Sequence, residues 1–202
     1  MGLKNTSNRF GGITKLLHWT IFLLFIVEFF LAYRREFFPT GSPQKLQYIL
    51  LHKSLGVCIF VLALIMILWR HVGTRPVMPL SMTPMEVFAA KSTHFLLYVI
   101  MLFQPVSGFL MSSFAGYAVA FFGLFTIPNY LTKNGELSKA FSVSHLWGSY
   151  LILALVSLHI IAAFFHQFIK RDTILKRMLP FVVSDDDKTL IKPPSKNIKI
   201  EL

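Results

Sequence analysis

Four of the seven histidines in this chain lie at two matched depths inside long apolar stretches: His18, His52, His145 and His159. A polar ring inside a bilayer loses its hydration, so an intramembrane histidine is a functional hypothesis by default. Imidazole is a common axial ligand of haem iron, and membrane and soluble bundles hold such cofactors with side chains on facing helices. We therefore favour haem ligation over unrelated hydrogen-bonded side chains.

The spacing of His145 and His159 sorts these ligands into two depths. Fourteen residues separate them on one predicted helix, which is roughly 21 Å along the axis and within some 40° of one face. His52 falls at the depth of His145 on the outer side, and His18 falls at the depth of His159 on the inner side. The sequence predicts two haems, each held by two histidines.

The other three histidines carry weaker signals. His166 follows His159 by seven residues near the inner surface, where it could bond a quinone carbonyl or lie among lipid headgroups. For His94 we favour a supporting or packing role over ligation, although a proton donor or a propionate contact is possible. His71 is interpreted as an interfacial anchor.

Charged residues surround the outer pair. Arg34, Arg35, Lys45 and Lys53 cluster in sequence near the outer ends of two spans. This cationic patch could steer an anion to the outer haem, or could bind propionates or lipid phosphates. Glu28 lies deep in the first span, where we favour a partnered structural acid over a step of a proton path.

Long apolar helices must position these side chains. The chain has 202 residues, of which 54% are hydrophobic and 14% charged. Stretches of bilayer-crossing length, about 20 residues, run at about 16–33, 47–70, 88–113 and 141–169. We predict an all-α membrane protein, a four-transmembrane-helix bundle enclosing two haems b, with an interfacial segment at about 114–129. The single Cys58 argues against a covalent haem, an iron–sulfur cluster or a zinc site.

The distribution of Lys and Arg predicts the orientation. More of them fall on the side of the two chain ends than on the opposite side, so both termini should be cytoplasmic. This topology explains the net charge of +11 better than nucleic-acid binding does. Residues 1–180 form the transmembrane domain, whose first span is predicted to be retained, and the polar stretch 181–202 is predicted to be a flexible cytoplasmic tail.

Several short motifs in order carry a family resemblance over about residues 10–180. They are Leu17-His18-Trp19, Arg35-Glu36-Phe37-Phe38-Pro39, Leu51-His52-Lys53, Lys91-Ser92-Thr93-His94, Gln104-Pro105-Val106-Ser107-Gly108, Ser144-His145, Leu158-His159, Arg171-Asp172-Thr173-Ile174-Leu175 and Met178-Leu179-Pro180. Together they resemble the bacterial cytochrome b561 family, in particular its superoxide oxidase type.

The resemblance implies a fold, cofactors and an activity. It implies two non-covalent haems b, one on His18 with His159 and one on His52 with His145, and a ubiquinone site near the inner surface that includes His166. The implied enzyme is a superoxide:ubiquinone oxidoreductase, a multi-pass protein of the bacterial cell inner membrane in contact with lipid. Superoxide, or another anionic donor, would meet the periplasmic patch that includes Arg34, Arg35 and Lys53.

Two rival functions are also compatible with the sequence. One is a cytochrome b subunit that links another redox protein or a dehydrogenase to the quinone pool, which would need a docking surface for that partner. The other is a metal or small-solute transporter that uses intramembrane histidines as transient ligands. That rival predicts a colourless protein, and the lack of a detectable inverted repeat argues against it.

Overall fold

The computed structural model describes residues 2–180, so the predicted tail at 181–202 lies outside the described residues. Four long helices dominate this part of the chain: α1 (Gly12–Arg34), α2 (Pro43–Val72), α3 (Pro84–Phe114) and α4 (Gly135–Phe164). A π-helix, η2 (Phe165–Lys170), continues α4, and a short helix, α5 (Ile174–Met178), follows. All four long helices are long and apolar enough to cross a membrane, which confirms the predicted fold class.

Capping residues explain why α2, α3 and α4 begin before the predicted apolar spans. Pro43 and Pro84 occupy the first turns of α2 and α3, where the missing N–H of proline costs no hydrogen bond. Thr83 and Glu86 form a reciprocal capping box at α3. The Asn134 side chain accepts a hydrogen bond from the Leu137 N–H at α4. These first turns are polar, so they do not belong to the apolar runs from which we predicted the spans. The predicted spans therefore begin a few residues after the helices do.

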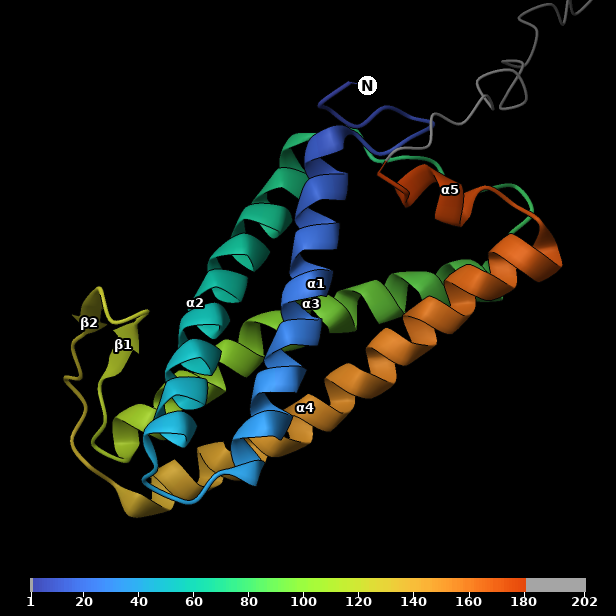
Figure 1. Cartoon of the computed structure of the whole chain (residues 1–202). Helices are drawn as coiled ribbons and strands as arrows, with labels where there is room; N and C mark the ends of the chain where they lie inside the picture. Colours follow the sequence, from blue (N-terminus) through green and yellow to red (C-terminus); the bar gives the residue numbers. More distant parts are fainter. Residues whose placement is uncertain (1, 181–202) are drawn as a thin grey trace, which may run out of the picture.

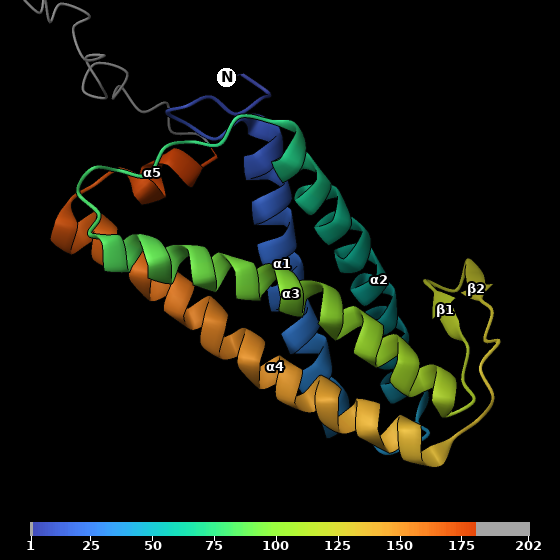
Figure 2. The same ribbon diagram turned by 180° about the vertical axis from the view of Figure 1, so that it is seen from behind.

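The four helices form two packed pairs, α1 with α2 and α3 with α4 (Figure 1). The pairs approach each other at one end and diverge toward the other, where α5 lies between them (Figures 1 and 2). The diverging end carries the start of α1 and the end of α4, and we call it the inner end, following the predicted orientation. The opposite end, which carries the start of α4, is the outer end.

The inner end is closed by contacts between α1 and the last residue of α5 and the residue after it. The Lys15 ammonium donates a hydrogen bond of 2.8 Å to the Leu179 carbonyl, and the Trp19 indole donates one of 2.9 Å to the Met178 carbonyl. Trp19 adjoins His18 in sequence, so these bonds fix the first turns of α1 that carry the inner histidine.

A β-hairpin occupies part of the segment predicted to lie along the interface. Strands β1 (Val119–Phe121) and β2 (Phe125–Ile127) pair antiparallel, and the turn uses positive φ at Phe122 and Gly123. The buried Ser54 hydroxyl of α2 accepts a 2.8 Å hydrogen bond from the Phe122 N–H. The hairpin therefore lies against α2 at the outer end, a small β element that periodicity did not predict.

Candidate functional site

The structure brings both predicted histidine pairs together. At the outer end the rings of His52 on α2 and His145 on α4 have centroids 6.1 Å apart. Toward the inner end His18 on α1 and His159 on α4 also have ring centroids 6.1 Å apart. One helix, α4, thus supplies one histidine to each pair, because His145 and His159 are fourteen residues apart on it.

The ring separation fits one metal ion between each pair. Metal–imidazole bonds are about 2.0 Å, so two opposite ring nitrogens on one iron lie about 4 Å apart and their ring centroids about 6 Å apart. Both observed separations agree with this geometry. The buried Nδ1 of His18 also has no hydrogen-bond partner within the described residues, which is consistent with a ring placed for coordination rather than for a polar contact.

Helix α3 fixes the orientation of His145. Nδ1 of His145 lies 3.1 Å from the Gln104 carbonyl oxygen and 3.1 Å from the Ser107 hydroxyl. A backbone carbonyl only accepts, so Nδ1 carries the proton and Nε2 is left free for a metal. The Gln104 amide also donates a 2.7 Å hydrogen bond to the His145 carbonyl. The motif around Gln104 thus acquires a structural role that its sequence alone did not reveal.

Gly108 completes this contact because it leaves room for the imidazole. A Cβ at position 108 would lie 2.9 Å from Cε1 of His145, closer than real Cβ atoms approach a neighbour. The ring and the α3 backbone therefore pack directly on each other.

Gly108→Ala is expected to lower haem affinity at the outer pair about tenfold, because the displaced ring leaves its proposed position on the iron. The rate of haem transfer to excess apomyoglobin measures this loss. Gly135→Ala is the control, since no atom lies within 4 Å of a Cβ at that position. Equal transfer rates for the two variants would contradict the prediction.

His52 has an acidic neighbour. The Glu28 carboxylate of α1 contacts Nδ1 of His52, and Glu28 is 7% exposed. Gly56, one turn after His52, lies beside Glu28: a Cβ there would be 3.8 Å from Oε1, an ordinary contact. Gly148 of α4 lies against the Gln104 side chain, which a Cβ at that position would displace.

His94 lies closer to the inner pair than the sequence indicated. Its ring centroid is 5.1 Å from that of His159, edge to face, and its Nδ1 donates a 2.6 Å hydrogen bond to the Ala90 carbonyl. The inner site is therefore a group of three histidines. His71, by contrast, is exposed and donates to the Ile67 carbonyl of its own helix.

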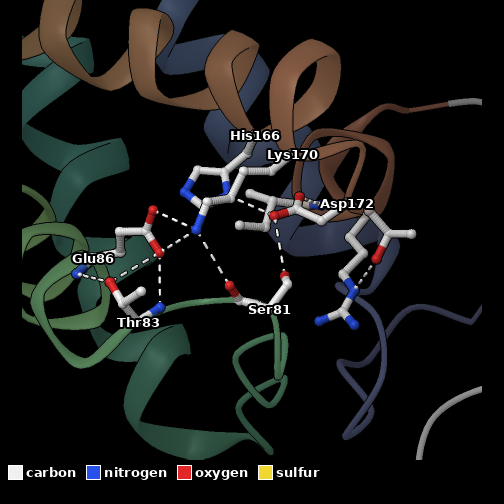
Figure 3. Close-up of polar contacts among 9 residues, drawn as sticks. Ser81, Thr83, Glu86, His166, Lys170 and Asp172 are labelled. Atoms are coloured by element: carbon white, nitrogen blue, oxygen red, sulfur yellow. Dashed lines mark hydrogen bonds and ion pairs between the residues drawn. The ribbon is translucent and has the colours of Figure 1, made fainter.

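His166 is buried at the inner end, with 7% of its surface exposed. Its Nδ1 lies 2.5 Å from an Asp172 carboxylate oxygen (Figure 3). Arg171 adopts a left-handed conformation, with φ 57°, and this sharp turn after η2 returns Asp172 to His166. The buried carboxylate pairing is a more specific environment than the headgroup position that we also considered.

A polar network ties this histidine–carboxylate pair to the loop before α3 (Figure 3). The Ser81 hydroxyl donates to Asp172 at 3.5 Å, and the Lys170 ammonium donates to the Ser81 carbonyl at 3.3 Å. Lys170 also pairs with Glu86 at 2.6 Å. Residues 81–86 and 166–172 are thus joined at the inner end, and Asp172 connects His166 to this network.

The outer basic residues form a partly neutralised patch. Arg35 and Lys45 lie 2.9 and 3.5 Å from the Glu36 carboxylate. The Arg34 guanidinium lies over the rings of Phe37 and Phe38, at 5.3 and 5.8 Å from their centroids. The fourth cation, Lys53, lies 6.0 Å from the centroid of the Tyr117 ring. Four cations against one carboxylate keep this end positive.

Sequence reasoning missed the residues that orient these histidines. Gln104, Ser107 and Gly108 belong to a motif that we had used only for the family resemblance, and Asp172 belongs to another. Those motifs were the available signal. Glu28 was noted as a buried acid, but its partner was not assigned.

Four membrane-crossing helices with paired imidazoles in their interior define the class of helical membrane cytochromes b. The chain belongs to the prokaryotic cytochrome b561 family, whose profile matches residues 9–181. Membership makes it a bacterial membrane protein of electron transfer that uses haem b.

Three curated relatives resemble the chain along most of its length. It is 30% identical to "Cytochrome b561 homolog 2" of Escherichia coli, over 92% of this chain and 98% of the relative. It is 27% identical to "Cytochrome b561 homolog 1" of the same organism, over 86% and 98%. A protein of Yersinia pestis named "Probable superoxide oxidase CybB" is 28% identical, over 81% and 92%.

Proposed function

We propose that this protein is a di-haem oxidoreductase of the bacterial inner membrane that passes electrons from superoxide at the periplasmic face to ubiquinone at the inner end. The observation that carries the proposal is the pair of imidazole sites at two depths, each with ring centroids 6.1 Å apart, joined by α4. In this proposal His52 and His145 hold the outer haem iron, and His18 and His159 hold the inner one.

The bound haems supply one-electron relays between the two membrane faces. The overall reaction oxidises two superoxide anions to two O₂ and reduces one ubiquinone, which takes up two protons, to ubiquinol. The chain's own residues bind and orient the reactants and hold the protons that the quinone needs.

His166 and Asp172 are the proposed quinone-binding and proton-handling residues. Asp172 accepts the Nδ1 proton of His166, so Nε2 is the nitrogen that, in the protonated ring, can donate a hydrogen bond to a quinone carbonyl. The carboxylate also stabilises an imidazolium that donates its proton to the reduced quinone, since opposite charge favours the charged form. The location of the pair at the inner end supports proton uptake from the cytoplasm.

The outer patch is proposed to steer superoxide. Arg34, Arg35 and Lys53 lie at the outer end with one carboxylate, Glu36, among them. A positive surface raises the encounter rate of a small anion, and this effect falls steeply with ionic strength. The name of the Yersinia pestis relative supports superoxide as the donor.

A superoxide pulse tests the proposal. Detergent-purified protein is expected to contain two haems per chain, to show reduced b-type bands within the pulse and to reoxidise when ubiquinone is added. Superoxide dismutase added before the pulse should abolish the reduction, and higher salt should slow it. Two haems that ignore superoxide would instead favour the subunit that links another redox protein to the quinone pool.

A further inference from the structure

We infer that Glu28 is a positioning residue for the outer haem: it accepts the Nδ1 proton of His52 and lowers the reduction potential of the outer haem. This inference rests on the proposed haem ligation. It deepens that proposal because it names one side chain that favours electron transfer from the outer haem to the inner one.

The contact joins two helices. Glu28 on α1 and His52 on α2 meet through the carboxylate and Nδ1, and Gly56 of α2 lies beside the same carboxylate. Among residues 2–180 neither the Glu28 oxygens nor Nδ1 of His52 has another hydrogen-bond partner. The two groups therefore depend on each other.

Ligation of iron through Nε2 would fix the direction of the hydrogen bond between His52 and Glu28. A neutral imidazole that ligates a metal through Nε2 carries its proton on Nδ1 and can only donate from that atom. A carboxylate beside the outer nitrogen of a metal-bound histidine is a recurring arrangement that fixes the ring and raises the basicity of the ligand. Burying an acid inside a membrane is unfavourable, so its single contact with a proposed ligand points to this role.

The remaining ligands have different surroundings. Nδ1 of His145 faces the neutral carbonyl of Gln104, and Nδ1 of His18 has no partner within the described residues. Among the four proposed ligands, and within the part of the chain that the structure describes, an ion-pair contact with a carboxylate occurs at His52. The two haem sites are therefore electrostatically unequal.

The carboxylate is expected to lower the reduction potential of the outer haem. A carboxylate near the outer iron stabilises its more positively charged, oxidised form, because opposite charges attract strongly where water is excluded. With haem bound, Glu28 would oppose the effect of the outer cations and would favour electron transfer from the outer site to the inner one.

Redox titration of the holoprotein with Glu28→Gln tests the inference. Glutamine has the same shape and keeps an acceptor oxygen but removes the charge, and it is better tolerated in a bilayer than glutamate. The reduction equilibrium of one haem is expected to shift at least tenfold toward the reduced form, which is about 59 mV for a one-electron couple. The other haem should keep its potential.

Three further variants keep the test specific. Glu36→Gln removes a negative charge at the exposed outer end without touching a ligand, so it reports the effect of net charge alone. Glu28→Leu removes the acceptor and is expected to lower haem affinity at one site 10- to 100-fold, with an altered low-spin EPR signal for that haem. His18→Ala is expected to retain the outer haem alone. Redox titration of the double variant Glu28→Gln, His18→Ala therefore shows whether the shifted potential belongs to the outer haem.

The outcomes separate this inference from the proposed function. If Glu28→Gln leaves both potentials unchanged, or shifts them no more than Glu36→Gln does, the role of Glu28 is overturned while two haems per chain still support the proposed function. If the wild-type protein binds no haem, the proposed function itself fails. A shift confined to one haem, larger than that of Glu36→Gln, supports the inference.

Discussion

His18→Ala is expected to leave one haem per chain, where the wild-type protein holds two. His18 and His159 have ring centroids 6.1 Å apart, the separation expected for two imidazoles on one iron with bonds of about 2.0 Å. Loss of one axial ligand from a buried site removes most of the binding energy for its haem. A pyridine haemochrome assay, referred to the protein concentration, measures the stoichiometry.

His94→Ala is the sharpest comparison for this prediction, because His94 is the nearer neighbour of His159. Their ring centroids are 5.1 Å apart, which is too close for an iron between opposed rings. His94→Ala is therefore expected to keep two haems, and so is His71→Ala, which alters an exposed ring. Loss of a haem from His94→Ala with retention in His18→Ala would assign the inner ligand to His94 instead.

His166→Ala is expected to slow haem reoxidation by ubiquinone roughly 10²- to 10⁴-fold, the usual contribution of a positioned proton donor. Haem content and reduction by superoxide should stay near wild type, because His166 belongs to neither ring pair. Stopped-flow absorbance, with a superoxide pulse followed by quinone, separates the two half-reactions in one experiment.

Two variants refine the test at His166. Asp172→Asn keeps the size of the side chain but removes the charge that stabilises an imidazolium, so reoxidation should slow by an intermediate factor. Glu86→Gln breaks the ion pair with Lys170 at the same end of the bundle while leaving Asp172 on His166. A wild-type rate for His166→Ala, or an equal loss for Glu86→Gln, would move the quinone site elsewhere.

The sequence by itself determined the membrane-spanning class and the order of the helices. Hydropathy and helical period are local properties, so four apolar runs predicted four long helices, and the observed α1 to α4 correspond to them. The same local geometry placed His145 and His159 at two depths of one helix, because rise and rotation per residue are constant along a helix. The pairing by depth followed from this spacing and the chain's alternating direction.

The sequence could not determine which side chains lie behind the histidines. That depends on how far each helix is rotated about its axis and where neighbouring helices cross, and both are set by packing between residues distant along the chain. Spacing did not indicate that Glu28 would meet His52, or that Gln104 and Ser107 would hold His145. The fraction of each polar side chain that is exposed likewise cannot be obtained from the amino-acid composition.

The sequence also did not predict the backbone conformations outside the regular helices. The hairpin at 119–127 depends on positive φ at two positions and on Ser54 of a distant helix. The return of Asp172 to His166 depends on a left-handed residue, Arg171, after a π-helix, and neither feature has a strong local signal. Depth and helix order were thus encoded locally, whereas tertiary packing decided the partners of each imidazole, because those partners come from other helices and from turns.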